Sequence, residues 1–130
     1  MAIPNGAGGY QLGDGNLTEI NFVVQTTPTA KTAAATLTAA ELATGIVTYT
    51  GAAVALTVPT AAALDVAFSN MKNDTSFDFV IINTGATNAA TVTANTGCTL
   101  VGVAAVSAAT SAQWRVRHTA DATYVFYRVS

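Results

Sequence analysis

The sequence predicts a mainly β fold: an antiparallel β-sandwich of the jelly-roll kind, with one or two short helices and an extended N-terminal arm. Apolar and polar residues alternate in short segments, as expected of strands with one buried face. Glycine and asparagine turns separate these segments at spacings of about 8–12 residues, which is typical of sandwiches and barrels. The 130 residues are 51% hydrophobic and only 9% charged, so we expect one domain with a real core and not a disordered chain. We place this domain at residues 18–130 and the arm at residues 1–17.

The predicted arm is rich in glycine and shows neither helical nor strand periodicity. Residues 1–16 hold five glycines and one proline, a composition that does not fold alone. Its apolar residues are candidate anchors on another protein surface: Ile3, Pro4, Tyr10 and Leu12. A terminus that simply stays loose is the alternative, and both interpretations remain open at this point.

The first patterned segments after the arm are a strand and a short helix. TEINFVVQ, residues 18–25, places its alternate apolar residues on one face of a predicted strand. LTAAELATG follows at residues 37–45, where Thr38 and Glu41 have the spacing of a capping box. The last glycine of that segment predicts the end of a helix of one or two turns.

The segment GIVTYTGAAVALTVPTAAAL, residues 45–64, carries no charged side chain. Its length is sufficient for a transmembrane helix, but threonines, a glycine and a proline interrupt it, and its apolar residues alternate with a period of two. We therefore expect a β-hairpin with its turn at Gly51, in which Tyr49 faces the core and Thr48 and Thr50 face outward. After the proline, the spacing of apolar residues predicts a second short helix.

The C-terminal half is a succession of predicted strands joined by turns. The strand segments are SFDFVIIN, AATVTA, CTLVGVAAVS, AQWRVRH and TYVFYRVS. In AQWRVRH, Trp114 and Val116 lie on one side of the strand, and Gln113, Arg115 and Arg117 lie on the other. This alternation indicates one buried and one solvent-facing side.

Residues able to carry out chemistry are few. The single histidine, His118, and the single cysteine, Cys98, supply neither a multi-ligand metal site nor a nucleophile paired with a base. Asp74 and Asp78 form the one convenient carboxylate pair, and a solvated loop explains them better than calcium binding or acid–base work. We therefore predict that the protein is not an enzyme and has no cofactor or metal.

Charge limits the partners in the same way. The net charge of -2 and the pI near 4.9 provide no cationic surface for nucleic acid, and the N-terminus lacks the pattern of a secretory signal. We expect neither a nucleic acid nor a membrane partner. Arg115 and Arg117, together with Arg128, are the one patterned charge cluster; they either stay hydrated or meet carboxylates of a partner subunit, and both alternatives stay open.

Five short motifs of the sequence resemble a family of small virion proteins of tailed bacteriophages. They are Leu-Thr-x-x-x-Leu at 37–42, Leu-Thr-x-Pro-Thr at 56–60, a strand like Phe-x-Val-Ile-Asn-x-Gly at 79–85, Thr-Leu-Val-Gly at 99–102 and the closing Tyr-Arg at 127–128. The resemblance covers nearly the whole chain after residue 37, and the arm carries none of it.

The resemblance implies a structural protein on the virion, typically a β-sandwich knob assembled as a homotrimer in the host cytoplasm. On the capsid surface it would bind the major capsid protein and cement the shell, with the arm as its contact. As a knob of a head or tail fibre it would instead bind a receptor or glycan through Tyr49, Tyr124 or Tyr127. The candidate residues of the subunit interface are Trp114, Arg115, Arg117, Phe126 and Tyr127. The chain supplies no fibre shaft and no heptads, so we favour capsid decoration.

Overall fold

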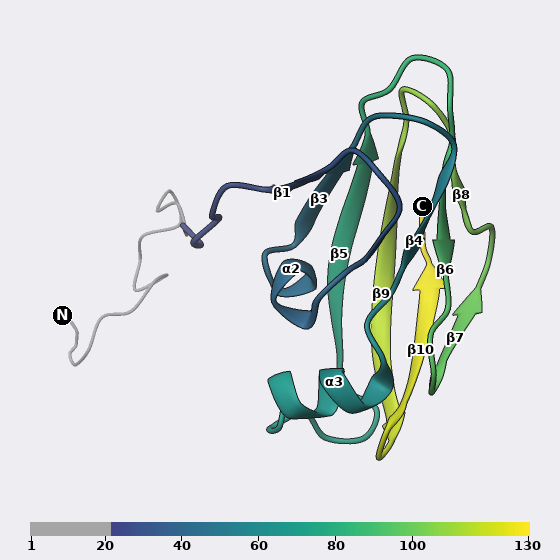
Figure 1. The fold of residues 1–130 in the computed structure, drawn as a ribbon. Helices are drawn as coiled ribbons and strands as arrows, with labels where there is room; N and C mark the ends of the chain where they lie inside the picture. The colour runs from purple at the N-terminus through teal and green to yellow at the C-terminus, as the bar shows by residue number, and fades with distance from the viewer. Residues whose placement is uncertain (1–21) are drawn as a thin grey trace, which may run out of the picture.

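The computed structural model describes residues 22–130, which form one body of two β-sheets with two short helices (Figure 1). The predicted arm, with Ile3, Pro4, Tyr10 and Leu12, lies outside the described residues. The strands are β1 (Thr29–Lys31), β2 (Ala35–Thr36), β3 (Ile46–Tyr49), β4 (Val54–Thr57), β5 (Ser76–Asn83), β6 (Ala90–Thr93), β7 (Cys98–Val101), β8 (Ala105–Val106), β9 (Ser111–Ala120) and β10 (Thr123–Arg128). The helices are α2 (Ala39–Ala43) and α3 (Ala61–Ala67).

The expected antiparallel jelly roll is wrong, because most strand pairs run parallel. One sheet has six strands in the order β1-β3-β5-β9-β10-β7, and the other has four in the order β2-β4-β6-β8. Strands β1, β3 and β5 are parallel neighbours, and so are β2, β4 and β6, and β7 and β10. Only β5 with β9, β9 with β10, and β6 with β8 pair antiparallel. The fold is mainly β, with two mixed sheets.

The parallel pairing follows from the path of the chain, which changes sheet after almost every strand. Odd-numbered strands up to β9 lie in the six-stranded sheet, and even-numbered strands up to β8 lie in the four-stranded one. When the chain next returns to the first sheet, it has completed a full turn around the body and therefore runs in its former direction. Helices α2 and α3 occupy two of the connections that lead from the four-stranded sheet back to the six-stranded one.

The hairpin expected at residues 45–58 is also wrong, because β3 and β4 belong to different sheets. Gly51, at the expected turn, instead lies where the chain crosses from one sheet to the other, and two neighbouring loops contact it there. Gly51 has φ +145°, and a Cβ there would lie 2.5 Å from the carbonyl oxygen of Thr32 in the loop before it. On the other side, Asn88 Nδ2 donates to the Gly51 carbonyl at 3.1 Å. No side chain fits between these loops, so the glycine is required by close approach of backbones.

Both short helices are confirmed, and their ends have local causes. The Thr38 hydroxyl accepts from the Glu41 N–H at 3.1 Å, while the Thr38 N–H donates to Glu41 Oε1 at 2.9 Å, which is the predicted capping box. In α3 the Thr60 hydroxyl accepts from the Ala63 N–H at 3.2 Å. With five and seven residues, these helices are too short for a bilayer, and no helix of residues 22–130 meets the length and hydropathy of a membrane span.

The core lies between the two sheets and is closed by one buried leucine from each helix. Tyr49 is 1% exposed, so its predicted inward orientation is confirmed, and its hydroxyl donates to the Ala52 carbonyl at 2.6 Å. The largest buried side chains are Trp114, Tyr49, Tyr124, Phe79, Phe126, Leu42 and Leu64. The strand expected at residues 18–25 is wrong for the part that is described, because residues 22–28 pair with no strand of the described body.

Candidate interaction surfaces

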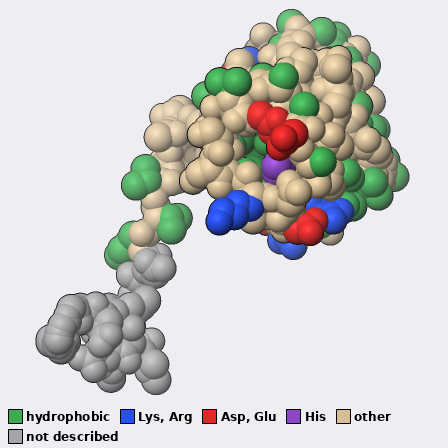
Figure 2. Space-filling model, turned by 90° about the horizontal axis from the view of Figure 1, so that it is seen from below, with side chains coloured by type: hydrophobic (Ala, Val, Ile, Leu, Met, Phe, Trp, Pro, Cys, Tyr) green, Lys and Arg blue, Asp and Glu red, His purple; other side chains and the backbone are tan. Residues whose placement is uncertain are grey.

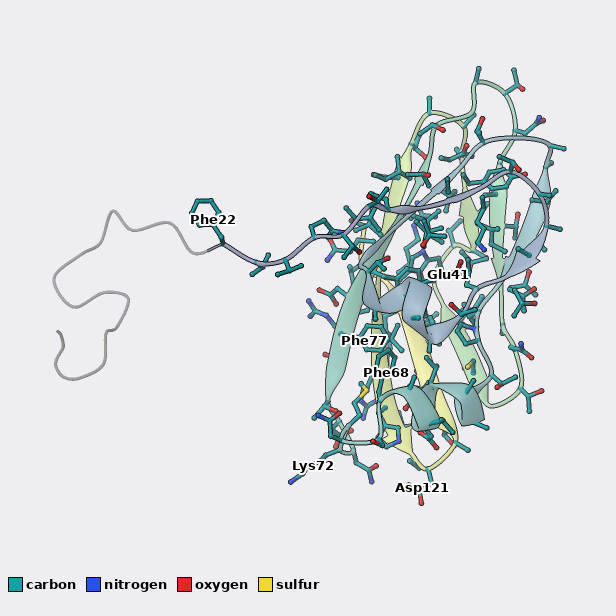
Figure 3. All side chains as sticks on the ribbon, turned by 60° about the vertical axis from the view of Figure 1, so that its left-hand side comes forward. Phe22, Glu41, Phe68, Lys72, Phe77 and Asp121 are labelled. Carbon is teal, nitrogen blue, oxygen red and sulfur yellow. The ribbon has the colours of Figure 1, made fainter. Side chains whose placement is uncertain are left out.

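A short extended segment leads from the body toward the N-terminal residues (Figure 1). It carries exposed apolar side chains, among them Phe22 (Figure 3). Phe22, Val23 and Val24 are 85%, 84% and 92% exposed. Burying an apolar side chain of this size removes enough surface from water to contribute about 1.5–3 kcal/mol. Three such residues in a row are costly to leave in solvent, which makes the segment a candidate contact surface.

The segment is fixed to the body where it reaches α2. Gln25 Nε2 donates to the Thr44 carbonyl at 2.7 Å, just beyond the end of the helix. Four residues later the chain enters β1, which runs parallel to β3 at the edge of the six-stranded sheet. Lys31 of β1 then forms an ion pair of 2.8 Å with Glu41 of α2. The direction in which residues 22–24 leave the body is therefore set by contacts to the neighbouring helix.

An open groove lies beside the same helix. It has a volume of about 320 Å³ and is lined by Leu42, Ala43, Phe68, Asn70, Met71, Ser76, Phe77 and Asp78. Its walls come from α2, from the turn after α3 and from the start of β5. The rings of Phe68 and Phe77 meet in it at a centroid distance of 5.0 Å and an angle of 57°, and both remain half-buried (Figure 3). Helical spacing predicts Phe68 and Met71 as core contacts, and nothing in the sequence indicates that they also line a groove.

The predicted arginine cluster is neutralised within the chain. Arg115 on β9 meets Asp78 directly across the strand pair, with Nε 2.8 Å from Oδ1. Arg117 Nη2 lies 2.6 Å from Asp74 Oδ1, and its Nη1 donates to the Tyr127 hydroxyl at 3.1 Å. The hydrogen bonds from Arg115 hold the pKa of the Asp78 carboxyl below its usual range. These pairs with aspartates of the same chain were not among the alternatives considered, but both arginine side chains stay partly exposed, at 53% and 42%, and contact with a partner subunit stays a prediction.

A second polar cluster closes the end of the body at α3. Asp65 accepts from the Tyr124 hydroxyl at 2.8 Å and from the Ala122 N–H at 2.6 Å, and His118 Nε2 lies 3.5 Å from Asp65 Oδ1. The hydrogen bonds from Tyr124 and Ala122 lower the pKa of the Asp65 carboxyl. Side chains of both charge signs surround the histidine at this end (Figure 2). Asp65 attaches α3 to the β9–β10 turn, and the lone histidine is buried at 5% exposure, as a structural residue would be.

Two of the proposed subunit-interface residues are in the wrong place for that role. Trp114 and Phe126 are both 0% exposed and pack in the core of the single chain. A sequence pattern shows that a strand has an apolar face, but not whether that face meets the chain's own second sheet or another subunit. Arg115 stays exposed and Tyr127 half-buried on the outer face of the six-stranded sheet, so these two and Arg117 remain accessible candidates.

Within residues 22–130, no group of three or more His, Cys, Asp or Glu side chains is placed to hold a metal ion. Asp74 and Asp78 each engage a separate arginine and do not converge on a cleft. Burial raises the pKa of the Cys98 thiol to about 11, which keeps it protonated and weakly nucleophilic.

Comparisons with protein-family models, with curated proteins and with solved structures returned no match.

Proposed function

We propose that this chain is a structural protein of a bacteriophage virion, which decorates and cements the capsid shell by binding the major capsid protein. The observation that carries the proposal is the extended segment at residues 22–24, whose three apolar side chains are at least 84% exposed. The segment joins the compact body to the glycine-rich residues that hold the candidate anchors Ile3, Pro4, Tyr10 and Leu12. A body with an exposed apolar segment suits a protein that acts by attachment.

The mechanism is stabilisation by linkage. A protein that binds the assembled shell, and not its separated subunits, stabilises the shell in proportion to its binding free energy. Many copies multiply a modest contact per copy, and a homotrimer of such bodies would engage several shell subunits at once. The resemblance of residues 37–128 to small virion proteins of tailed phages supports this role.

A fibre knob that binds a receptor or glycan is the second candidate, and the burial of its tyrosines weighs against it. Tyr49 and Tyr124 are 1% and 0% exposed, so neither is available as a stacking platform. Of the three tyrosines proposed for that role, only Tyr127 reaches the surface, and it accepts a hydrogen bond from Arg117. The knob would have to recognise its ligand with different residues.

The test is quantitative mass spectrometry of purified virions of the phage that encodes the chain. We expect hundreds of copies per particle, in a simple ratio to the major capsid protein. A dozen copies would indicate a tail or fibre component, and absence from the particle would refute a virion role altogether.

A second measurement tests the attachment itself. Undecorated shells are incubated with the full chain or with a chain lacking residues 2–17, and the heat stability of the shells is followed by light scattering. The full chain should raise the disruption temperature and the truncated chain should not. Equal stabilisation by both would remove the arm from the mechanism.

A further inference from the structure

The groove beside α2 and the apolar segment that leaves the body lie next to the same, C-terminal end of that helix. Gln25 is bonded to the Thr44 carbonyl, and Ala43, the preceding residue, lines the groove. We propose that the groove is a docking site for residues 22–24 of a second copy of this chain, so that neighbouring copies exchange their N-terminal segments. This inference concerns self-association and holds whether or not the chain belongs to a virion.

The groove has the chemistry to accept Phe22. Its floor is apolar and contains Leu42, which is fully buried, and the half-buried rings of Phe68 and Phe77. Those two rings are already tilted against each other, and a third ring entering beside them can pack against them in a similar tilted arrangement. The volume of about 320 Å³ admits a phenylalanine side chain and part of a flanking valine. Asn70 and Ser76, which line the groove and are exposed, leave hydrogen-bonding groups for the incoming backbone.

The local sequence favours a neighbour's groove over the chain's own. Docking in the same chain would require the backbone to reverse sharply just before Gln25, whose side chain is bonded to the body. Val23 and Val24 are β-branched and favour extended backbone, and no glycine lies between residues 22 and 28 to form a tight turn. Figure 3 shows Phe22 directed away from the body that holds Phe68 and Phe77.

The position of the two surfaces also makes the contact self-complementary. Donor segment and acceptor groove lie next to the same end of α2, so two copies that face each other there can each give a segment and receive one. Three residues of extended chain span at most about 10 Å, which keeps the two bodies in contact at α2. The same reach allows a closed ring in which each copy donates to the next.

Disulfide trapping shows whether residues 22–24 dock in the groove of their own chain or in the groove of a second copy. In a Cys98→Ser background, one chain carries Val23→Cys, which leaves Phe22 in place, and a differently tagged chain carries Ala43→Cys at the groove. Mild oxidation of the mixture should give the mixed disulfide. Ala40→Cys, an exposed position on the same helix that does not line the groove, is the matched control and should give little. A single chain with both Val23→Cys and Ala43→Cys that closes only an internal disulfide would overturn the proposal, and so would the absence of any specific disulfide.

Sedimentation equilibrium of the full chain gives an independent measurement. We expect self-association that weakens by about tenfold or more with Phe22→Asp, as for a buried aromatic anchor. Val66→Asp, which changes another valine that is 84% exposed but lies on α3 away from the groove, should leave it unchanged. Ala43→Lys should weaken it and Ala40→Lys should not, with circular dichroism confirming that each variant is folded. A monomeric wild type, or equal effects of the groove variants and their controls, would refute the exchange.

Discussion

Asn83 is a buried polar side chain that joins the two sheets through its hydrogen bonds. It lies at the end of β5, is 1% exposed, and uses three hydrogen bonds. Its Nδ2 donates to the carbonyls of Asn88 at 2.8 Å and of Val106 at 3.0 Å, and its Oδ1 accepts from the Gly85 N–H at 3.0 Å. Val106 belongs to β8, so this one amide connects the six-stranded sheet to the four-stranded one and to the loop between β5 and β6.

Replacing Asn83 with alanine should therefore be severely destabilising. Each hydrogen bond contributes about 1 kcal/mol net, and the buried backbone groups left without a partner add a desolvation cost. We expect the free energy of unfolding to fall by about 3 kcal/mol, a large fraction of the stability of a small domain. Urea denaturation followed by circular dichroism measures this loss. Asn70→Ala, at an exposed position, is the control and should change stability by less than about 0.5 kcal/mol.

The substitution Asn83→Asp keeps the size of the side chain and removes its N–H donors, so it tests the hydrogen bonds apart from the packing. A carboxylate at this position would be buried against the Asn88 and Val106 carbonyls, both of which need a donor. Burial and these carbonyls should raise its pKa in the folded state above the value of about 3.9 in the unfolded chain. The loss of stability of the Asn83→Asp variant relative to the wild type is then full at neutral pH, and it shrinks as the pH falls through the raised pKa. A deficit independent of pH, or an Asn83→Ala loss below about 1 kcal/mol, would show that this amide does not connect the sheets.

Three further perturbations test other contacts. Gly97→Ala should lower the free energy of unfolding, measured by urea denaturation, by at least about 2 kcal/mol. The reason is that φ is +81° and the new Cβ would lie 2.6 Å from both the Ala122 carbonyl oxygen and Ala61 Cβ. A neutral result would mean that the turn shifts freely. The Asp65 carboxyl has a lowered pKa in the folded protein, so its stabilisation is present above about pH 3.9 and is lost as the pH falls through the folded pKa. Asp65→Asn should accordingly lose stability at neutral pH and approach the wild type in acid, and a constant difference would contradict this. Cys98, with a pKa of about 11, should react with a thiol reagent at pH 8 roughly a hundredfold more slowly than a free cysteine, and rapid labelling of the native protein would show that the site opens.

The features that could be predicted from the sequence are those with local causes. Helix α2 was predicted from a capping threonine, a carboxylate three residues on and a terminal glycine. Helix α3 was predicted from the proline and the threonine before it and from the helical spacing of its apolar residues. All of these signals act within one or two turns. The inward orientation of Tyr49 followed from the period of two. Each of these signals depends on neighbours along the chain and on nothing that the fold brings from elsewhere.

The strand partners could not be predicted, because the period of a strand is the same in parallel and antiparallel sheets. Gly51 indicated a turn, and a turn between two strands most often makes a hairpin, whereas here the chain crosses to the other sheet. The contact between Arg115 and Asp78 could not be predicted for the same reason. The sequence shows an arginine pair and an aspartate pair, and only the alignment of β5 with β9 places Arg115 opposite Asp78. The groove likewise depends on the fold, because the end of α2 lies far along the chain from the segment between α3 and β5 that forms its other walls.

The placement of charge determines how the described body can recognise a partner. Of the chain's five Lys and Arg residues, four are engaged within the body: Lys31 with Glu41, Arg115 with Asp78, Arg117 with Asp74, and Arg128 with the carbonyls of Val103 and Ala105. A surface whose charges are mostly engaged within the chain gives little electrostatic steering and little salt dependence to association. Contact must then come from apolar area, and the most exposed apolar area lies at residues 22–24. Association of this protein should therefore persist when the salt concentration is raised, and a steep loss with salt would mean that these ion pairs exchange partners at the interface.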